Sequence, residues 1–135
     1  MNFANRDLMC FACGKDNPIG LHLEFSVDEN SCRTSFVPRP EHQSYDGRMH
    51  GGLISTILDE TMGNYSYLYE HKIVYTARME IRFRQPVLIG EKINVVATVK
   101  KRRGRLIEMF GQVLRMDGTV AAEADAKMMY EENNE

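Results

Sequence analysis

Residues 50–59 read His50-Gly51-Gly52-Leu53-Ile54-Ser55-Thr56-Ile57-Leu58-Asp59. Apolar positions recur at helical spacing from here to Tyr69, so we predict one long helix that begins at Gly51 or Gly52. Backbone N–H groups at a helix start lack partners inside the helix and attract negative charge, and glycine lets another molecule approach them closely. Asp59 lies about two turns along this helix, amid apolar residues. An anion-stabilising turn followed by one inward carboxylate suits the hydrolysis of an activated acyl group.

Alternating apolar and polar residues on both sides of this helix predict strands. Two short strands precede the helix and four follow it, over residues 21–27, 32–37, 77–83, 93–99, 106–116 and 120–128. A basic turn at residues 100–104 and the pair Asp117-Gly118 join later strands, and such short turns imply antiparallel neighbours. Because a lone helix must bury its apolar stripe against the sheet, we predict a single α+β domain over residues 1–135, with a curved sheet around a central helix. The uncovered edges favour pairing with a second copy.

Composition narrows the classes of function. The chain is 43% hydrophobic and 27% charged, which is typical of a globular domain. Its net charge of -2 gives no general attraction to nucleic acid or to an anionic membrane, so we expect neither as a partner. Residues 1–7 are polar and no apolar run reaches membrane-spanning length, which argues against a signal peptide and a membrane span. Three cysteines do not fit a disulfide framework, so we expect a reduced, cytoplasmic protein.

Asp59 and its neighbour Glu60 are not equivalent on the predicted helix. Asp59 lies on the flank of the apolar stripe, whereas Glu60 points away from the stripe, toward solvent or a partner. Small residues line the flank beside Asp59 and favour a groove there; they are Ser55, Gly63 and Ser66. A solvated helix residue is an equally good interpretation of Asp59.

His50 and the glycine pair also have two interpretations each. His50 is either a loop residue bonded to backbone or the residue that orients the glycine turn. No cysteine or serine stands where it would complete a nucleophilic triad with His50. Gly51 and Gly52 are either a flexible helix entry or an approach point for a ligand, and their cost in helix stability favours the ligand.

Cys10 and Cys13 form a lone C-x-x-C. Zinc would need two further ligands, and although Cys32 and His22 are conceivable, their spacing does not support them. A redox pair would require a helix start and a different fold. We therefore predict a structural turn here and no metal site.

Several blocks of the chain resemble one family. They are residues 13–21 (CGKDNPIGL), residues 41–52 (EHQSYDGRMHGG), Asp59 nine positions after the histidine, the strand that runs from Thr76 to Pro86-Val87 with Gly90-Glu91, and residues 121–124 (AAEA). Together they resemble the hotdog-fold acyl-CoA thioesterases, in particular the phenylacetate-pathway-like branch of the 4-hydroxybenzoyl-CoA thioesterase superfamily. The resemblance covers nearly the whole chain and implies the hotdog fold.

This resemblance implies an acyl-CoA thioesterase that uses no metal or prosthetic group and works as a homodimer or homotetramer. Its active sites would lie between the helix of one subunit and the loop and strand of another. The thioester carbonyl would lie against the N–H of Gly51, next to Gly52, and Asp59 would act as general base or as nucleophile. His50 precedes the glycine pair, and the upstream loop residue Gln43 would polarise the carbonyl or hold water. Position 44, where some relatives carry asparagine, is Ser44 here.

The resemblance also implies a role for Thr76 and a set of substrate contacts. Thr76 would help to place the water, but in an unbroken strand it would share its face with Arg78 and Glu80; a bulge or a site shared across subunits would resolve this conflict. The depth of the acyl pocket would depend on packing around Met62, Tyr65 and Tyr67. Two sets of cations are candidates for the phosphates of coenzyme A: Lys101, Arg102 and Arg103 of the basic turn, and Arg82 with Arg84 on one strand face. A solvated turn is the alternative for the first set.

Three functions remain open at this point. Hydrolysis of an acyl-CoA thioester is the leading hypothesis. A non-catalytic acyl-CoA binder or sensor would keep the groove and the cations. A hotdog hydratase or dehydratase would use a histidine with a carboxylate across the dimer, whereas a histidine directly before the glycine pair is the thioesterase arrangement.

Overall fold

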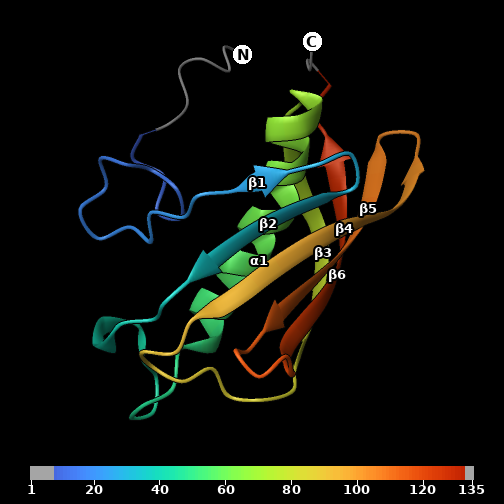
Figure 1. The fold of residues 1–135 in the computed structure, drawn as a ribbon. Coiled ribbons are helices and arrows are strands. Elements are labelled where there is room, and N and C mark those ends of the chain that lie inside the picture. Colours follow the sequence, from blue (N-terminus) through green and yellow to red (C-terminus); the bar gives the residue numbers. More distant parts are fainter. Residues whose placement is uncertain (1–7, 133–135) are drawn as a thin grey trace.

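The predicted helix occupies the middle of the fold (Figure 1). In the computed structural model, which describes residues 8–132, α1 spans Gly51–Tyr65 and continues as a wider π-helical turn, η2, over Ser66–Glu70. His71 then takes a left-handed conformation, with φ of 58°, and ends the helical segment. The predicted helix to Tyr69 is therefore confirmed to within one residue.

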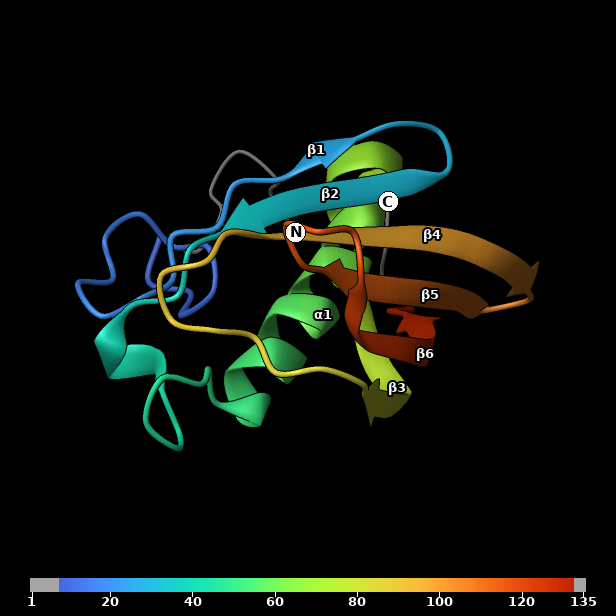
Figure 2. The same ribbon diagram turned by 60° about the horizontal axis from the view of Figure 1, so that its bottom comes forward.

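A six-stranded antiparallel sheet curves around this helix (Figures 1 and 2). The strands are β1 (Ser26–Val27), β2 (Ser31–Phe36), β3 (Val74–Phe83), β4 (Ile93–Arg103), β5 (Leu106–Leu114) and β6 (Val120–Tyr130), and a short turn of helix, η1 (Pro40–His42), precedes α1. Their order across the sheet is β1-β2-β4-β5-β6-β3, so the two-residue β1 and the ten-residue β3 form the two edges. This arrangement confirms the predicted α+β class.

The core lies between α1 and the concave face of the sheet. The helix contributes seven buried residues: Ile54, Ile57, Leu58, Thr61, Met62, Asn64 and Tyr65. The facing strands carry small residues, among them Gly111 of β5 and Ala124 of β6. A Cβ atom on Gly111 would lie 3.1 Å from Cδ2 of Leu58, so this glycine lets the helix approach the sheet closely.

Two strand predictions were wrong at their ends. Residues 21–25 alternate in burial but are not in the sheet, because the N–H groups of Leu21 and Leu23 bond to the carbonyls of Phe11 and Ala12 at 2.8 and 2.9 Å. His22, with φ of 54°, breaks the extended backbone between them. The predicted basic turn is the end of β4, and the chain reverses only at Gly104, whose φ is 59°.

Among residues 8–132, no helix combines the length and the apolar content needed to cross a membrane.

Candidate functional site

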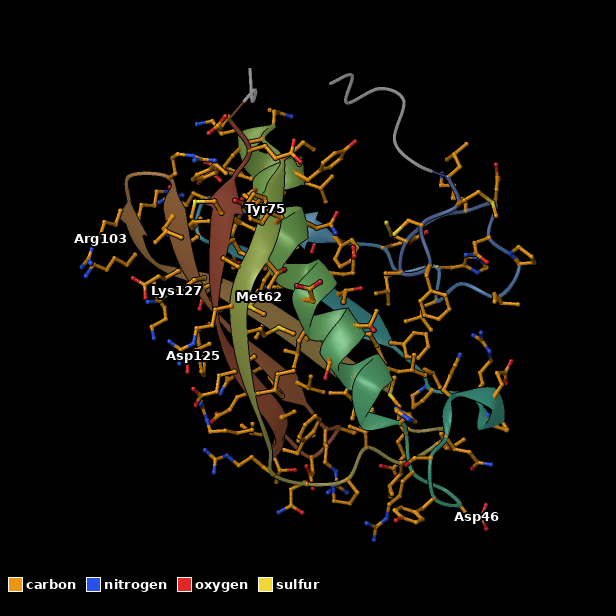
Figure 3. All side chains as sticks on the ribbon, turned by 180° about the vertical axis from the view of Figure 1, so that it is seen from behind. Asp46, Met62, Tyr75, Arg103, Asp125 and Lys127 are labelled. Carbon is orange, nitrogen blue, oxygen red and sulfur yellow. The ribbon has the colours of Figure 1, made fainter. Side chains whose placement is uncertain are left out.

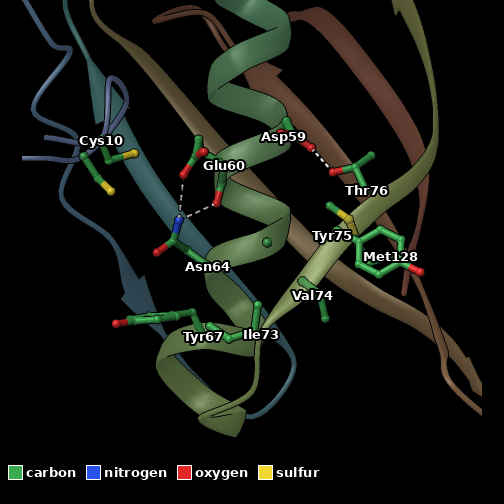
Figure 4. Close-up of a pocket in the computed structure, with 12 residues that line it drawn as sticks. Cys10, Asp59, Glu60, Asn64, Tyr67, Ile73, Val74, Tyr75, Thr76 and Met128 are labelled. Atoms are coloured by element: carbon green, nitrogen blue, oxygen red, sulfur yellow. Dashed lines mark hydrogen bonds between the residues drawn. The ribbon is translucent and has the colours of Figure 1, made fainter. Parts of the chain in front are cut away.

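Asp59 and Thr76 meet on the open flank of the helix (Figure 4). Asp59 is half-buried on α1, and its Oδ1 accepts a hydrogen bond from Oγ1 of Thr76 on β3. The contact joins residues that lie 17 positions apart in the chain. Asp59 is therefore held by a specific partner.

A bulge in β3 explains why Thr76 faces the helix. Thr76 pairs with Met128 of β6, but Arg78 pairs with the preceding residue, Lys127, which leaves Ala77 as the extra residue. Since Met128 is buried on the concave face, Thr76 faces the same side. Of the two solutions that the sequence left open for Thr76, the bulge is present.

Asp59 and Thr76 line a pocket of about 380 Å³ between α1, the start of β3 and the N-terminal loop. Tyr67 lines this pocket, as expected, but Met62 and Tyr65 do not. Both are 0% exposed, and Tyr65 donates a 2.6 Å hydrogen bond to the carbonyl of Glu29. Figure 3 shows Met62 between the helix and the sheet. Met62 and Tyr65 thus lie in the core, as their place on the apolar stripe of the helix predicts, and the contact of Met62 with substrate stays a prediction.

Glu60 also turns toward this pocket, where it lies with Cys10 and Cys13 (Figure 4). Glu60 points away from the apolar stripe, as predicted, and the N-terminal loop that holds Cys10 and Cys13 lies beside it on this side of α1. The sulfur atoms of both cysteines and a carboxylate oxygen of Glu60 lie within 4.8 Å of one another. The C-x-x-C spacing was the only sequence signal for this cluster, because the contact with Glu60 is tertiary.

One backbone N–H group at the start of α1 is available to bind a ligand. The ring Nδ1 of His50 accepts from the N–H of Gly52 at 2.8 Å, and the carbonyl of His50 accepts from Leu53 and Ile54. Within residues 8–132, these bonds leave the N–H of Gly51 without an acceptor. His50 is thus bonded to backbone within the glycine turn, which fits both of its interpretations, and the N–H of Gly51 is the donor left over.

Gln43 forms hydrogen bonds within the loop that precedes α1, residues 43–49. Its Oε1 accepts from the N–H of Gly47 at 3.0 Å, and its backbone forms an isolated bridge with Met49. Gln43, His50 and Gly52 together line a shallow hollow of about 310 Å³ beside the helix start. Ser44 is exposed outside this hollow, and its N–H bonds to the carbonyl of Arg48 at 2.9 Å.

The predicted site residues therefore form two groups within one chain. Gly51, His50 and Gln43 lie at the start of α1, whereas Asp59 and Thr76 lie further along it. Eight residues of helix separate Gly51 from Asp59, which corresponds to about 12 Å along the axis. One carbonyl group cannot contact the Gly51 amide and the Asp59 carboxylate of the same chain.

Arg82 and Arg84 lie on the convex face of the sheet, away from α1. Arg82 forms ion pairs with Asp125 at 2.8 Å and Glu123 at 3.3 Å, and Arg84 pairs with Glu123 at 2.6 Å. Hydrogen bonds from Arg84 and Arg82 hold the pKa of Glu123 below its usual value, and those from Arg82 and Lys100 do the same for Asp125. The charges of Arg82 and Arg84 are therefore compensated within the chain.

The three cations at the end of β4 differ in their contacts. Arg102 donates 3.1 Å hydrogen bonds to Glu70 of η2 and to the hydroxyl of Tyr65. Within the described part of the chain, Lys101 and Arg103 are exposed and form no ion pair, and Arg103 extends away from the sheet in Figure 3. Arg102 is thus a structural contact, and Lys101 and Arg103 are the available cations of the three.

A comparison with protein families identifies the group to which this chain belongs. The model of the thioesterase superfamily matches residues 46–122, which contain the helix and most of the sheet. The chain belongs to the thioesterase superfamily. The sequence resemblance to this superfamily is thus confirmed.

Solved structures in this group share the fold. The E. coli PaaI protein from the phenylacetic acid degradation operon has a TM-score of 0.75 and 15% identity, over 81% of this chain and 83% of its own. The Streptococcus mutans UA159 protein smu.793, solved with acetyl CoA, has a TM-score of 0.77 and 16% identity, over 84% of this chain and 91% of its own. The fold of this thioesterase-superfamily chain is therefore the hotdog fold.

Two curated proteins similar to this chain are named as dehydratases and not as thioesterases. The 3-hydroxyacyl-[acyl-carrier-protein] dehydratase FabZ of Magnetococcus marinus is 38% identical over 63 residues, which are 47% of this chain and 40% of that protein. FabZ of Campylobacter hominis is 32% identical over 100 residues, which are 67% of this chain and 63% of that protein. The chain thus matches about half of the length of these two relatives.

Proposed function

We propose that this protein hydrolyses acyl-CoA thioesters to a carboxylic acid and coenzyme A. Water adds to the thioester carbonyl carbon, the carbon–sulfur bond breaks, and the coenzyme leaves as a thiolate that takes up a proton. Asp59 either removes a proton from that water, or attacks the carbonyl itself, expels the thiolate and forms a mixed anhydride that water then hydrolyses to release the acid and free Asp59. The N–H of Gly51 stabilises the negative charge that develops on the carbonyl oxygen.

The unpartnered N–H of Gly51 is the observation that carries this proposal. It stands at the positive end of the helix dipole, and the ring of His50 fixes the turn that presents it. Asp59, held by Thr76, supplies the carboxylate that the reaction needs. Because these groups lie about 12 Å apart along one helix, we infer that each site takes Gly51 from one protomer and Asp59 from another.

A homodimer or a larger assembly built from dimers follows from this geometry. The edge strand β3 carries Thr76 and spans ten residues with one side unpaired, so it can pair with a second copy. In this arrangement, Lys101 and Arg103 are the candidates for the phosphates of coenzyme A. The acetyl CoA bound to the smu.793 protein supports this choice of substrate class.

Substitutions at Gly51 separate the role of its N–H from the role of its small size. Proline at Gly51 removes the N–H and adds a ring, and the backbone is suited to it because Gly51 is the first helical position and His50 has φ of -62° and ψ of 131°. Alanine keeps the N–H and places its Cβ 3.5 Å from the ring of Phe83, an ordinary contact. We expect Gly51→Pro to lower kcat by about 100- to 1000-fold and Gly51→Ala to remain close to wild type.

The assay follows release of thiol from a panel of acyl-CoA and aryl-CoA substrates. Asp59→Asn should abolish most of the release, with unchanged circular dichroism. Equal activity in Gly51→Pro and Gly51→Ala, or in wild type and Asp59→Asn, would refute the proposal. Binding of acyl-CoA without turnover by the wild type would identify a sensor instead of an enzyme.

The similarity to the two FabZ proteins favours one second candidate, dehydration of a 3-hydroxyacyl thioester or the reverse hydration. His50 would then act with Asp59 of another protomer. Incubation with crotonyl-CoA distinguishes the two reactions, because hydration removes the conjugated double bond without release of thiol. Loss of the double bond at a rate above that of thiol release would establish the second candidate.

A further inference from the structure

The N-terminal loop holds Cys10 and Cys13 in a rigid turn. The N–H of Gly14 bonds to the carbonyl of Cys10 at 2.8 Å, and the N–H of Asp16 bonds to the carbonyl of Leu8 at 2.9 Å. A Cβ atom on Gly14 would lie 2.4 Å from the backbone of both Cys10 and Leu8, so only glycine fits after the second cysteine. The turn therefore has a fixed shape.

This turn is also anchored to the rest of the molecule. Ala12, between the two cysteines, is 2% exposed, and the carbonyls of Phe11 and Ala12 accept hydrogen bonds from Leu21 and Leu23. These bonds fix the C-x-x-C on the side of α1 where Glu60 lies (Figure 4). Hydrogen bonds and packing of the turn thus fix the positions of the Cys10 and Cys13 backbones relative to α1.

Glu60 has its own support on the helix. Nδ2 of Asn64, one turn further along, donates to Oε2 of Glu60 at 3.2 Å and to its backbone carbonyl at 2.8 Å. This pair of bonds orients the carboxylate toward the two sulfur atoms. A hydrogen-bonded ligating carboxylate is the usual outer-shell arrangement at metal sites.

We propose that Cys10, Cys13 and Glu60 bind a zinc ion that fastens the N-terminal loop to α1. Two thiolates and one carboxylate suit zinc, and thiolate sulfur selects against magnesium and calcium. Three protein ligands leave the fourth tetrahedral position for water on the side of the pocket. The metal thus completes a wall of the pocket that also contains Asp59.

The distances are compatible with this site. Ligand atoms around tetrahedral zinc lie about 3.5 to 3.8 Å apart, given a zinc–sulfur distance of about 2.3 Å. The three ligand atoms here lie within 4.8 Å of one another, so rotations of the side chains bring them to the metal. The backbone of the turn and of α1 can stay in place.

The test measures metal binding by reduced protein. We expect about one zinc per chain by elemental analysis, and a cobalt complex of the metal-free protein with thiolate charge-transfer absorption and tetrahedral d–d bands. Glu60→Gln keeps the shape of the side chain and should weaken zinc by at least the roughly 10- to 100-fold loss typical of outer-shell changes. Cys10→Ser and Cys13→Ser should abolish the charge-transfer band.

Cys32→Ala is the matched control, because Cys32 is buried outside the cluster, and it should keep the stoichiometry of the wild type. At a fixed low zinc concentration, the melting temperature should rise in the wild type and in Cys32→Ala by more than in Glu60→Gln. Absence of the cobalt bands in reduced wild type, or wild-type zinc affinity in Glu60→Gln, would overturn the proposal. None of these metal-binding measurements depends on thioester hydrolysis. The zinc proposal can therefore fail while the thioesterase proposal stands, and the reverse.

Discussion

At the scale of single residues, hydrogen bonds within the chain determine which polar groups of the candidate site remain available to a substrate. The ring of His50 takes the N–H of Gly52, which leaves that of Gly51 available. Thr76 directs its hydroxyl at Asp59. We propose that the hydroxyl of Thr76 acts through this carboxylate, a role that can be separated from the packing of its methyl group.

Valine and serine at position 76 make that separation. Thr76→Val keeps the shape but removes the donor to Asp59, so kcat should fall by about 10- to 100-fold with little change in KM. Thr76→Ser keeps the donor and should retain most of the activity. Steady-state kinetics with one acyl-CoA measure both effects, and equal losses in the two variants would mean that the methyl group matters instead.

Sequence reasoning at this scale identified residue types better than it identified neighbours. It selected Gly51 and Asp59 from the pattern of the helix, whereas Thr76 came from the family resemblance and against the strand alternation. It placed Met62 on the apolar stripe, and the structure buries this side chain in the core. The partners of Arg82 lie on β6, 41 and 43 positions away, and no local pattern indicates them.

At the scale of elements, two contacts fix α1 against the sheet. Gly111 of β5 lets Leu58 approach. At the other end, Glu70 of η2 accepts hydrogen bonds from Arg102 of β4 and from the hydroxyl of Tyr130 on β6. Each contact gives a prediction about stability.

Alanine should have opposite effects at two glycines. Gly111→Ala places a methyl group 3.1 Å from Leu58 and should lower the free energy of unfolding by about 1 to 3 kcal/mol. Gly63→Ala lies mid-helix with nothing within 4 Å, so it should raise that free energy by about 0.5 to 1 kcal/mol. Urea unfolding compares the two, and a stabilising Gly111→Ala would contradict the close approach of the helix.

Tyr130 should make the fold sensitive to alkali. Burial, together with the hydrogen bond to Glu70, raises the pKa of Tyr130 from 10.0 to about 12. The folded protein therefore keeps a proton that the unfolded chain releases, so this contribution to stability is complete below pH 10 and is lost between pH 10 and about 12. The stability difference between wild type and Tyr130→Phe should be constant up to pH 9 and shrink above pH 10. A constant difference to pH 12 would contradict this assignment.

Periodicity was a good guide to elements and a poor guide to their ends. The helix and the last four strands follow from their spacing, because burial on one face imposes it. Residues 21–25 have the same alternation without strand pairing, since the N-terminal loop covers them. The bulge at Ala77 inserts one residue without a mark in composition, so only the strand register reveals it.

At the scale of the whole molecule, the proposed reaction requires more than one chain, because Gly51 and Asp59 lie too far apart on one helix. A dimer joined along β3 would bring a second copy to the strand that carries Thr76. A monomer would then be inactive even when its fold is intact. Mixed assemblies of two defective chains test this directly.

Gly51→Pro and Asp59→Asn should complement each other. Both are expected to be inactive alone, but random pairing makes half of the dimers mixed, and each mixed dimer has one intact site. Coexpression should therefore restore about one quarter of the wild-type activity per chain. Light scattering establishes the assembly, and purification through two different tags isolates the mixed form. An inactive mixed dimer would show that the two groups do not act in one site.

The two edge strands of the sheet differ greatly in length: β3 has ten residues and β1 has two. Strand addition needs a long row of free backbone groups, and within residues 8–132 the longest such row is on β3. In the proposed dimer a second copy occupies β3, and the edges that remain, β1 and the uncovered part of β2, are shorter. Assembly through the sheet is therefore self-limiting, and concentrated samples should remain free of fibrils.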